Sequence, residues 1–233
     1  VVNQLPNLRW YQSTWAGVEP LLRAGMRRDY LLSNVRGVYG PQMAEYVFGY
    51  LLLIERGSLS RWQAQQAGVW DTSLPGTLRW KTLGLLGVGS IGAHLAQTAR
   101  HFRMHVHGYT NNSAACPDID QYFHGEALLE FAAGLDYLVC SLPGTAATYH
   151  LVDANLLRAL PPHAWLVNIG RGSSVDQAAL VEALHSRRLA GAVLDVFEQE
   201  PLPPGHPLWH TPNTFITAHV AARNHPPDIA GLF

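Results

Sequence analysis

The chain has 233 residues, of which 48% are hydrophobic, and its formal net charge is −1 at pH 7. This length and apolar content allow one or two domains with a substantial core. A charge so close to zero excludes a global basic field that would hold nucleic acid or an anionic membrane. The longest apolar run, residues 46–54, is too short to cross a bilayer. We therefore expect a small-molecule partner, and neither nucleic acid nor a membrane.

Cysteine and histidine usage argues against a disulfide framework or a metal site. Cys116 and Cys140 lie far from any CxxC spacing, which fits a reducing compartment, and we expect the cytoplasm. Among the histidines, His105 and His107 share one predicted strand, and no carboxylate or cysteine cluster accompanies them. No metal is expected.

The N-terminal part of the chain predicts a small strand-helix-strand unit. Residues 8–13 and 29–34 are strand candidates, and residues 18–24 between them have a helical pattern. Pro41 then stands at the favoured first turn of a helix that continues to about Gly57. Residues 68–81 are rich in turn formers and lack periodicity, which indicates a linker.

From Thr82 onward, strands and helices alternate. Strands are predicted at 82–86, 104–109, 136–140, 164–168, 191–195 and 214–217, with helices at 90–102, 126–133, 153–159 and 176–186. Near-continuous apolar strands such as AWLVNI predict a doubly wound, parallel α/β sheet that is covered on both faces.

The domain organisation follows from these patterns. We divide the chain into residues 1–74, which hold too few elements to close a sheet of their own, residues 75–223, which hold the alternating elements, and residues 224–233 that follow them. Because the chain opens at Val1 rather than at methionine and stops soon after a proline-containing turn, we expect it to be an interior part of a longer chain.

A glycine motif follows the first of the alternating strands. The run TLGLLGVGSIG turns at Gly87, Gly89 and Gly92 directly into the helical pattern AHLAQTAR. Glycines at this spacing let backbone amides approach a pyrophosphate at a helix N-terminus. A purely structural turn is the alternative, but a strand before and a helix after are the context that a dinucleotide site requires.

Polar residues that could do chemistry follow other predicted strands. Arg171 has a guanidinium suited to binding a carboxylate, although a surface ion pair would need the same residue. His219 could act as a general acid near neutral pH or be a buried, merely satisfied histidine. Asp195 and Glu200 lie in the loop LDVFEQEPLP. Because ligands of parallel sheets bind beyond the carboxyl ends of the strands, we expect these residues to converge.

Taken together, these segments resemble the D-isomer-specific 2-hydroxyacid dehydrogenase family. The resemblance rests on motifs in the same order, namely GVGSIG, SLPGTAAT, VNIGRGSSVDQAALVEAL, AGAVLDVFEQEPLP, HPLW and PNTFITAHVAA. Within the family, QMAEYV and LDVFEQEPLPPGHPLW are most similar to the glyoxylate/hydroxypyruvate (2-ketoacid) reductases. One departure is Ala218, where the family usually has a proline before its histidine.

The resemblance implies that residues 75–223 form a Rossmann dinucleotide-binding domain. Residues 1–74 would then be the incomplete part of a flavodoxin-like substrate domain, and residues 224–233 the start of the return to it. The resemblance implies reduction of a 2-ketoacid to a D-2-hydroxyacid, with Arg171 binding the substrate carboxylate and His219 donating the proton. Glu200 would hydrogen-bond His219, and the backbone amides of Ala16 and Gly17 would hold the carboxylate from the other domain.

The resemblance also implies a nicotinamide cofactor. Its binding residues would be Gly87, Val88, Gly89, Ser90, Ile91, Gly92, Thr110, Asn111, Leu142, Pro143, Thr148, Ile169, Gly170 and Asp195, the last orienting the carboxamide. Thr110 stands where NAD-selective enzymes carry an acid, so we expect NADPH to be used at least as well as NADH. The family leads us to expect a homodimer. Phosphoglycerate or D-lactate dehydrogenase activity and a non-catalytic, NAD(H)-sensing corepressor remain alternatives.

Overall fold

The computed structural model describes residues 2–232, which contain a small two-stranded sheet and a larger seven-stranded sheet. The small sheet pairs β1 (Trp10–Gln12) with β2 (Leu31–Ser33) in parallel. Only the 3-10 turns η1 (Val2–Gln4) and η2 (Glu19–Leu21) accompany it. The helix predicted at 18–24 is therefore wrong. Pro20 lacks an amide hydrogen and disfavours a helical backbone in the residue before it, which prevents a full helix in so short a segment.

The large sheet is entirely parallel, with strand order β5-β4-β3-β6-β7-β8-β9. Its strands are β3 (Thr82–Leu86), β4 (His105–Tyr109), β5 (Gln121–Phe123), β6 (Tyr137–Cys140), β7 (Trp165–Asn168), β8 (Gly191–Leu194) and β9 (Thr214–Ile216). The chain starts the sheet at β3, adds strands on one side and then returns to the other side at β6. This order confirms the doubly wound Rossmann fold, and the reversal between β3 and β6 is where such sheets bind ligands.

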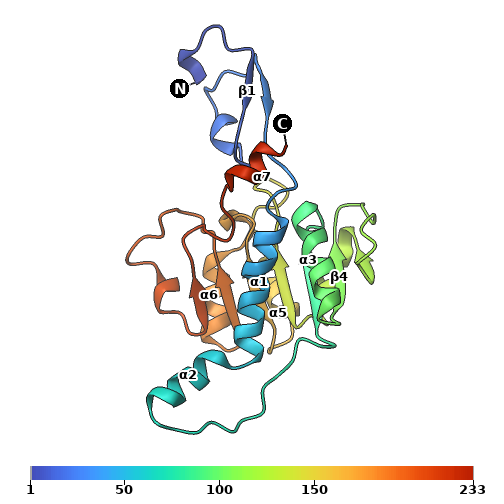
Figure 1. Cartoon of the computed structure of the whole chain (residues 1–233), viewed down its shortest axis with the longest axis vertical. Helices are drawn as coiled ribbons and strands as arrows, with labels where there is room; N and C mark the ends of the chain where they lie inside the picture. The colour runs from blue at the N-terminus through green and yellow to red at the C-terminus, as the bar shows by residue number, and fades with distance from the viewer. Residues whose placement is uncertain (1, 233) are drawn as a thin grey trace.

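Helices cover both faces of the large sheet (Figure 1). On one face, α1 (Gly40–Glu55) and α3 (Ser90–His101) pack against Leu83, Leu85 and Val139. On the other face lie α4 (Leu128–Ala132), α5 (Ala154–Ala159) and α6 (Gln177–His185). Successive strand residues therefore enter different cores, which explains why the central strands β3, β6, β7 and β8 are buried along their length rather than alternating.

A helix and a strand next to the predicted elements, α2 (Ser58–Gln66) and β5, were not predicted. α2 contains no buried residue, so its sequence lacks the apolar periodicity by which an amphipathic helix is recognised. β5 has three residues, of which one, Phe123, is buried. The remaining short elements are η3 (Gly125–Ala127), η4 (Gly172–Ser174), η5 (Pro207–His210) and α7 (Pro226–Ala230). Within residues 2–232, no helix has the length and apolar character needed to span a membrane.

The small sheet and α7 lie at one end of the molecule, and α2 with its following loop lies at the opposite end (Figure 1). α1 runs from the small sheet into the core of the large one, where Val47 and Leu51 are fully buried. The segment that leads to α7 returns beside the start of α1, since the Tyr39 hydroxyl donates to Asn224 at 2.6 Å. The small sheet is thus joined to the large one by two chain segments.

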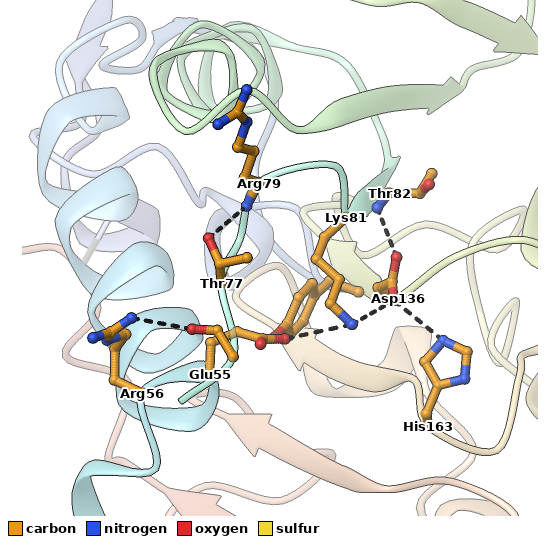
Figure 2. A network of polar contacts seen from close by, with 10 residues as sticks. Glu55, Arg56, Thr77, Arg79, Lys81, Thr82, Asp136 and His163 are labelled. Atoms are coloured by element: carbon orange, nitrogen blue, oxygen red, sulfur yellow. Dashed lines mark hydrogen bonds and ion pairs between the residues drawn. The ribbon is translucent and has the colours of Figure 1, made fainter. Parts of the chain in front are cut away.

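A polar network closes the amino edge of the large sheet, where α1 ends and β3 and β6 begin (Figure 2). Lys81 Nζ lies 3.0 Å from Asp136 Oδ1 and 3.7 Å from Glu55 Oε1. The other Asp136 oxygen accepts the Thr82 amide at 2.8 Å. Burial disfavours the charged amine, but the hydrogen bond and negative charge of Asp136, followed by those of Glu55, outweigh it and raise the pKa of Lys81. The network therefore keeps the Lys81 charge.

Tyr137→Phe tests how much this network stabilises the fold. The Tyr137 hydroxyl donates to Glu55 Oε1 at 2.6 Å, and burial, followed by this bond, raises its pKa, so it remains a donor. Removing the hydroxyl takes one hydrogen-bond donor from the half-buried Glu55 carboxylate, and it should lower the free energy of unfolding by about 1–3 kcal/mol in urea denaturation. Tyr149→Phe, at an exposed tyrosine, is the control and should cost less than about 0.5 kcal/mol. Equal effects of the two changes would contradict the prediction.

Candidate functional site

The turn between β3 and α3 lies at the strand-order reversal and contains three glycines with different surroundings. Gly87 has φ +98°, which side chains rarely adopt, and a Cβ on Gly92 would lie 2.4 Å from the Gly87 carbonyl oxygen. At Gly89, by contrast, φ is −87° and an added Cβ would meet no heavy atom within 4 Å. The fold thus requires glycine at 87 and 92. The open space at Gly89, directly before the N-terminus of α3, fits the close approach of a pyrophosphate.

The loops that follow β6, β7 and β8 are in direct backbone contact through two glycines. A Cβ on Gly170 would lie 2.6 Å from the Leu142 carbonyl oxygen, and one on Gly172 would lie 1.8 Å from the Phe197 carbonyl carbon. Arg171 stands between these two contacts. Its main-chain oxygen accepts from Asn168 Nδ2 at 3.1 Å, and its Nη1 donates to the Gly170 oxygen at 2.8 Å. The packing of three loops therefore determines where the Arg171 side chain begins.

His219 and Glu200 form a hydrogen-bonded pair beyond β9 and β8. His219 Nδ1 lies 2.8 Å from Glu200 Oε2, and Glu200 Oε1 accepts the Phe197 amide at 2.9 Å. Because an ionised carboxylate only accepts, Nδ1 carries the hydrogen of this bond. The bond orients the imidazole and leaves Nε2 as the nitrogen that could exchange a proton with a ligand. The His219 side chain is 51% exposed.

Asp195 is the buried centre of the segment that carries His219. Its residue is 1% exposed, and Oδ1 accepts from Thr217 Oγ1 at 2.5 Å and from the Val220 amide at 2.8 Å. Oδ2 accepts from the Ala221 amide at 3.0 Å, and the main-chain oxygen accepts from the His219 amide at 2.8 Å. These bonds compensate for the burial of the carboxylate and hold the residues on both sides of His219.

The backbone of His219 itself is left-handed, with φ +55°. A non-glycine residue in this region costs about 1–3 kcal/mol and persists where its surroundings hold it in place. The four hydrogen bonds to Asp195 supply that restraint.

A cleft of about 760 Å³ lies between the small sheet and the carboxyl edge of the large one. It brings together many of the residues predicted from the sequence: Ala16, Gly17, Gly89, Ser90, Ile91, Leu142, Pro143, Ile169, Gly170, Arg171 and His219. The cationic Arg171 and the titratable His219 thus share a cleft with the open turn at Gly89, and the cleft is large enough for a small organic ligand.

Other predicted residues lie outside the lining of this cleft. Gly87, Gly92, Glu200 and Asp195 support it from behind through the contacts already described. Val88 lines a neighbouring cavity over α3, and Thr110 and Asn111 follow β4 further along the sheet edge. Thr148 makes an internal turn, because its Oγ1 donates to the Pro143 oxygen at 2.6 Å and accepts the Thr145 amide at 3.0 Å. Thr148 thus shapes the loop that carries Pro143.

Sequence reasoning missed several residues of the cleft. Asn34 lines it and holds the Ala16 loop, since Asn34 Nδ2 donates to the Ala16 oxygen at 2.6 Å. Trp15, Arg36, Tyr39 and Met43 also contribute to the lining. No motif pointed to them, because their positions depend on how the small sheet sits above the large one.

No group of three or more histidine, cysteine, aspartate or glutamate residues within 2–232 is arranged to hold a metal ion. The profile described as "D-isomer specific 2-hydroxyacid dehydrogenase, NAD binding domain" matches residues 48–221. The chain belongs to this family. The matched range contains the whole large sheet, including the glycine turn, Arg171, Glu200 and His219, whereas the side of the cleft formed by Ala16, Gly17 and Asn34 lies before it.

Two relatives show the same likeness in sequence. Glyoxylate reductase of Thermofilum pendens is 32% identical over 95% of this chain and 68% of its own length. Glyoxylate/hydroxypyruvate reductase A of Salmonella heidelberg is 32% identical over 81% of this chain and 61% of its own length. The chain thus spans about two thirds of the length of these relatives.

Two solved structures show the likeness in three dimensions. A family member from Aeromonas salmonicida superposes with a TM-score of 0.94 at 43% identity, over 100% of this chain and 75% of that one. The NADPH-dependent glyoxylate/hydroxypyruvate reductase of Sinorhizobium meliloti, in complex with NADP and sulfate, superposes with a TM-score of 0.88 at 29% identity. The match covers 97% of this chain and 72% of that one. Both likenesses extend over nearly the whole of this chain.

Two substitutions, Gly89→Ala and Gly92→Ala, test which glycine of the turn serves ligand binding and which serves the stability of the fold. Gly89→Ala fills open space with a methyl group, so it should weaken NADPH binding roughly tenfold or more, about 1.4 kcal/mol, without changing the urea midpoint of the nucleotide-free protein. Gly92→Ala should lower that midpoint, because its Cβ meets the Gly87 oxygen. Nicotinamide fluorescence measures the Kd. Unchanged affinity in Gly89→Ala, or a loss of stability equal to that of Gly92→Ala, would contradict this assignment.

Proposed function

We propose that the chain supports NAD(P)H-dependent reduction of a small 2-ketoacid, of the glyoxylate or hydroxypyruvate type, to the D-2-hydroxyacid. The observation that carries the proposal is that Arg171 and His219 line one cleft with the open turn at Gly89. This reaction needs a cationic group that binds the substrate carboxylate, a proton donor and a binding site for the dinucleotide. The names of the Thermofilum, Salmonella and Sinorhizobium relatives support the substrate class.

Substrate binding would use both sides of the cleft. Arg171 presents a permanent charge to the carboxylate and polarises the neighbouring keto oxygen. The backbone amides of Ala16 and Gly17 would hold the same carboxylate from the side of the small sheet, where Asn34 supports their loop. Two opposed contacts would hold the ketoacid in one orientation, which lowers the entropic cost of reaching the reactive geometry.

Proton transfer would fall to His219. The bound nicotinamide supplies a hydride to the carbonyl carbon, and negative charge then develops on the keto oxygen. Protonated His219 would donate from Nε2 to this oxygen, while its Nδ1–H bond to Glu200 keeps the imidazole in place. In the reverse direction, the neutral imidazole would accept the hydroxyl proton.

Asp195 would have two roles. By the family resemblance it would orient the nicotinamide carboxamide, from a position behind the lining of the cleft where the residue is 1% exposed. The hydrogen bonds of Asp195 hold the His219 segment. The carboxylate would therefore connect the position of the cofactor with that of the proton donor.

His219→Ala and Glu200→Gln test the assignment of the proton donor. His219→Ala should lower kcat for ketoacid reduction by about 100-fold or more, within the range for losing a general acid. Glu200→Gln keeps the shape but removes the charged acceptor of Nδ1–H, so we expect a smaller loss, roughly 10-fold or more, with unchanged NADPH affinity. Initial rates of NADPH oxidation with glyoxylate and hydroxypyruvate measure both, and Glu130→Gln, on the remote helix α4, is the control.

Near-wild-type turnover of His219→Ala would remove this residue from the role proposed for it. If the wild-type protein binds NADPH but reduces none of a panel of 2-ketoacids, a nucleotide-sensing protein would be favoured over an enzyme. Activity confined to phosphohydroxypyruvate or pyruvate would favour phosphoglycerate or D-lactate dehydrogenase.

The cofactor preference would be set beside the end of β4. Thr110 replaces the acid that would accept the ribose hydroxyls and repel a 2′-phosphate, and its Oγ1 donates to the Ser113 oxygen at 2.5 Å. His124, directly after β5, supports this corner, since its Nδ1 lies 2.9 Å from the Thr110 main-chain oxygen. A neutral corner would accept the extra phosphate of NADPH.

We therefore expect kcat/KM with NADPH to equal or exceed that with NADH. Thr110→Asp should lower the NADPH value roughly tenfold or more, because a carboxylate would face the 2′-phosphate, while the NADH value is kept or improved. Thr110→Asn is the neutral control of similar size. Steady-state kinetics with both cofactors would contradict the prediction by showing a strong wild-type preference for NADH.

Assembly and location are also proposals. α2 and its following loop expose large apolar side chains, with Trp70 90% and Leu74 96% exposed, which supports a homodimer that covers this end of the molecule. Both cysteines are free, and burial raises the pKa of the Cys140 thiol to about 11, so it stays protonated and unreactive near neutral pH. Free thiols support a reducing compartment such as the cytoplasm.

A further inference from the structure

A chain of hydroxyl groups connects α1 with the buried carboxylate of Asp195. Tyr46 Oη, from the middle of α1, lies 2.7 Å from Thr217 Oγ1, and Thr217 Oγ1 lies 2.5 Å from Asp195 Oδ1. The single hydroxyl hydrogen of Thr217 is used on the carboxylate, so Tyr46 must be the donor to Thr217. The bonds therefore run in one direction, from Tyr46 through Thr217 to Asp195, and each strengthens the next.

The Tyr46 hydroxyl must be protonated to act as the donor to Thr217. Burial is the main cause that raises the pKa of Tyr46, and the negative charge of Asp195 adds to it. The Tyr46 hydroxyl therefore stays protonated near neutral pH and can donate to Thr217.

At its other end, the chain of bonds reaches the backbone around His219. Thr217 and the Val220 amide share Oδ1 of Asp195, the Ala221 amide uses Oδ2, and the His219 amide uses the main-chain oxygen. A shift of the carboxylate would therefore move the residues on both sides of the left-handed His219. Tyr46 is the group outside this segment that fixes the Thr217 hydroxyl on Asp195.

α1 contacts the same segment at two further points. Gln42 accepts the Arg223 amide at 2.9 Å and donates to the Arg223 oxygen at 3.1 Å, and the Tyr39 hydroxyl donates to Asn224. Positions 39, 42 and 46 recur on one side of a helix. Hydrogen bonds thus hold residues 217–224 against α1. The partner of Tyr46, Thr217, is the contacted residue nearest to His219 in sequence.

We propose that Tyr46 is a positioning residue for His219, acting through Thr217 and Asp195. The inference rests on the proposed role of His219 as proton donor. It assigns part of the geometry of the reaction to a side chain on α1 that lines no part of the ligand cleft.

The test removes one hydroxyl at a time from the complete natural protein. Tyr46→Phe and Thr217→Val should each lower kcat roughly tenfold, while the Kd of NADPH changes less than about twofold, because the proton donor moves but the glycine turn does not. Thr217→Ser, which keeps the hydroxyl, should retain most of the activity. The double variant should be no slower than Thr217→Val, because both changes break one chain of bonds.

Tyr137→Phe is the matched control. It also removes a buried tyrosine hydroxyl bonded to a side chain of α1, but the partner is Glu55 at the amino edge of the sheet, away from the bonds of Thr217 and Asp195. It should lower stability and leave kcat unchanged. An equal loss of kcat in Tyr137→Phe and Tyr46→Phe would overturn the proposal, because the effect would then follow stability alone.

A second readout does not depend on any activity. The imidazole signal of His219 in a histidine-labelled NMR spectrum, assigned by its loss in His219→Gln, should shift in Tyr46→Phe and Thr217→Val but not in Tyr137→Phe. If the protein reduces no ketoacid yet these shifts occur, the proposed function fails and the positioning contact stands. Unshifted His219 signals with wild-type kcat, or additive losses in the double variant, would overturn the contact through Thr217.

Discussion

Seven parallel strands that end at the same edge are the constraint on which the rest of this structure depends. Because every carboxyl end faces the same way, the loops after β3, β6, β7 and β8 must share one limited space. Gly170 and Gly172 let three of these loops touch through their backbones, and the open turn at Gly89 completes the edge. Arg171 and His219, 48 positions apart in the printed sequence, line one cleft for this reason.

The buried carboxylate of Asp195 organises the second half of the site. A negative charge with 1% exposure is tolerated only where hydrogen bonds replace water, and the segment 217–221 supplies all of those observed for its side chain. The same bonds hold the left-handed backbone of His219, so the need to satisfy one charge also places the imidazole beside Glu200. Through Thr217, this arrangement extends to α1, the helix that leads to the small sheet.

Sequence patterns predicted the large sheet well and its margins poorly. The central strands β3, β6, β7 and β8 are short, buried and largely apolar runs, and every strand of the large sheet except β5 was predicted. β5 and α2 were not predicted, because each buries few side chains or none. The prediction of a helix at 18–24 was wrong because Pro20 interrupts a short pattern. The placement of domain boundaries within residues 1–233 remains a prediction, although α1 shares a buried core with β3 and α3.

By itself, the sequence determined the fold class, the glycine turn, the family and the residues that could carry charge or a proton. These follow from local periodicity and from short motifs, which depend on neighbours a few positions away. The family resemblance also implied the Glu200–His219 hydrogen bond. Only the tertiary structure decided that Asp195 uses its acceptors for the His219 segment, and that Asn34 and Tyr46 support the site. Such contacts join residues from 18 to 171 positions apart, and no local pattern records which of many polar side chains will meet when the loops pack.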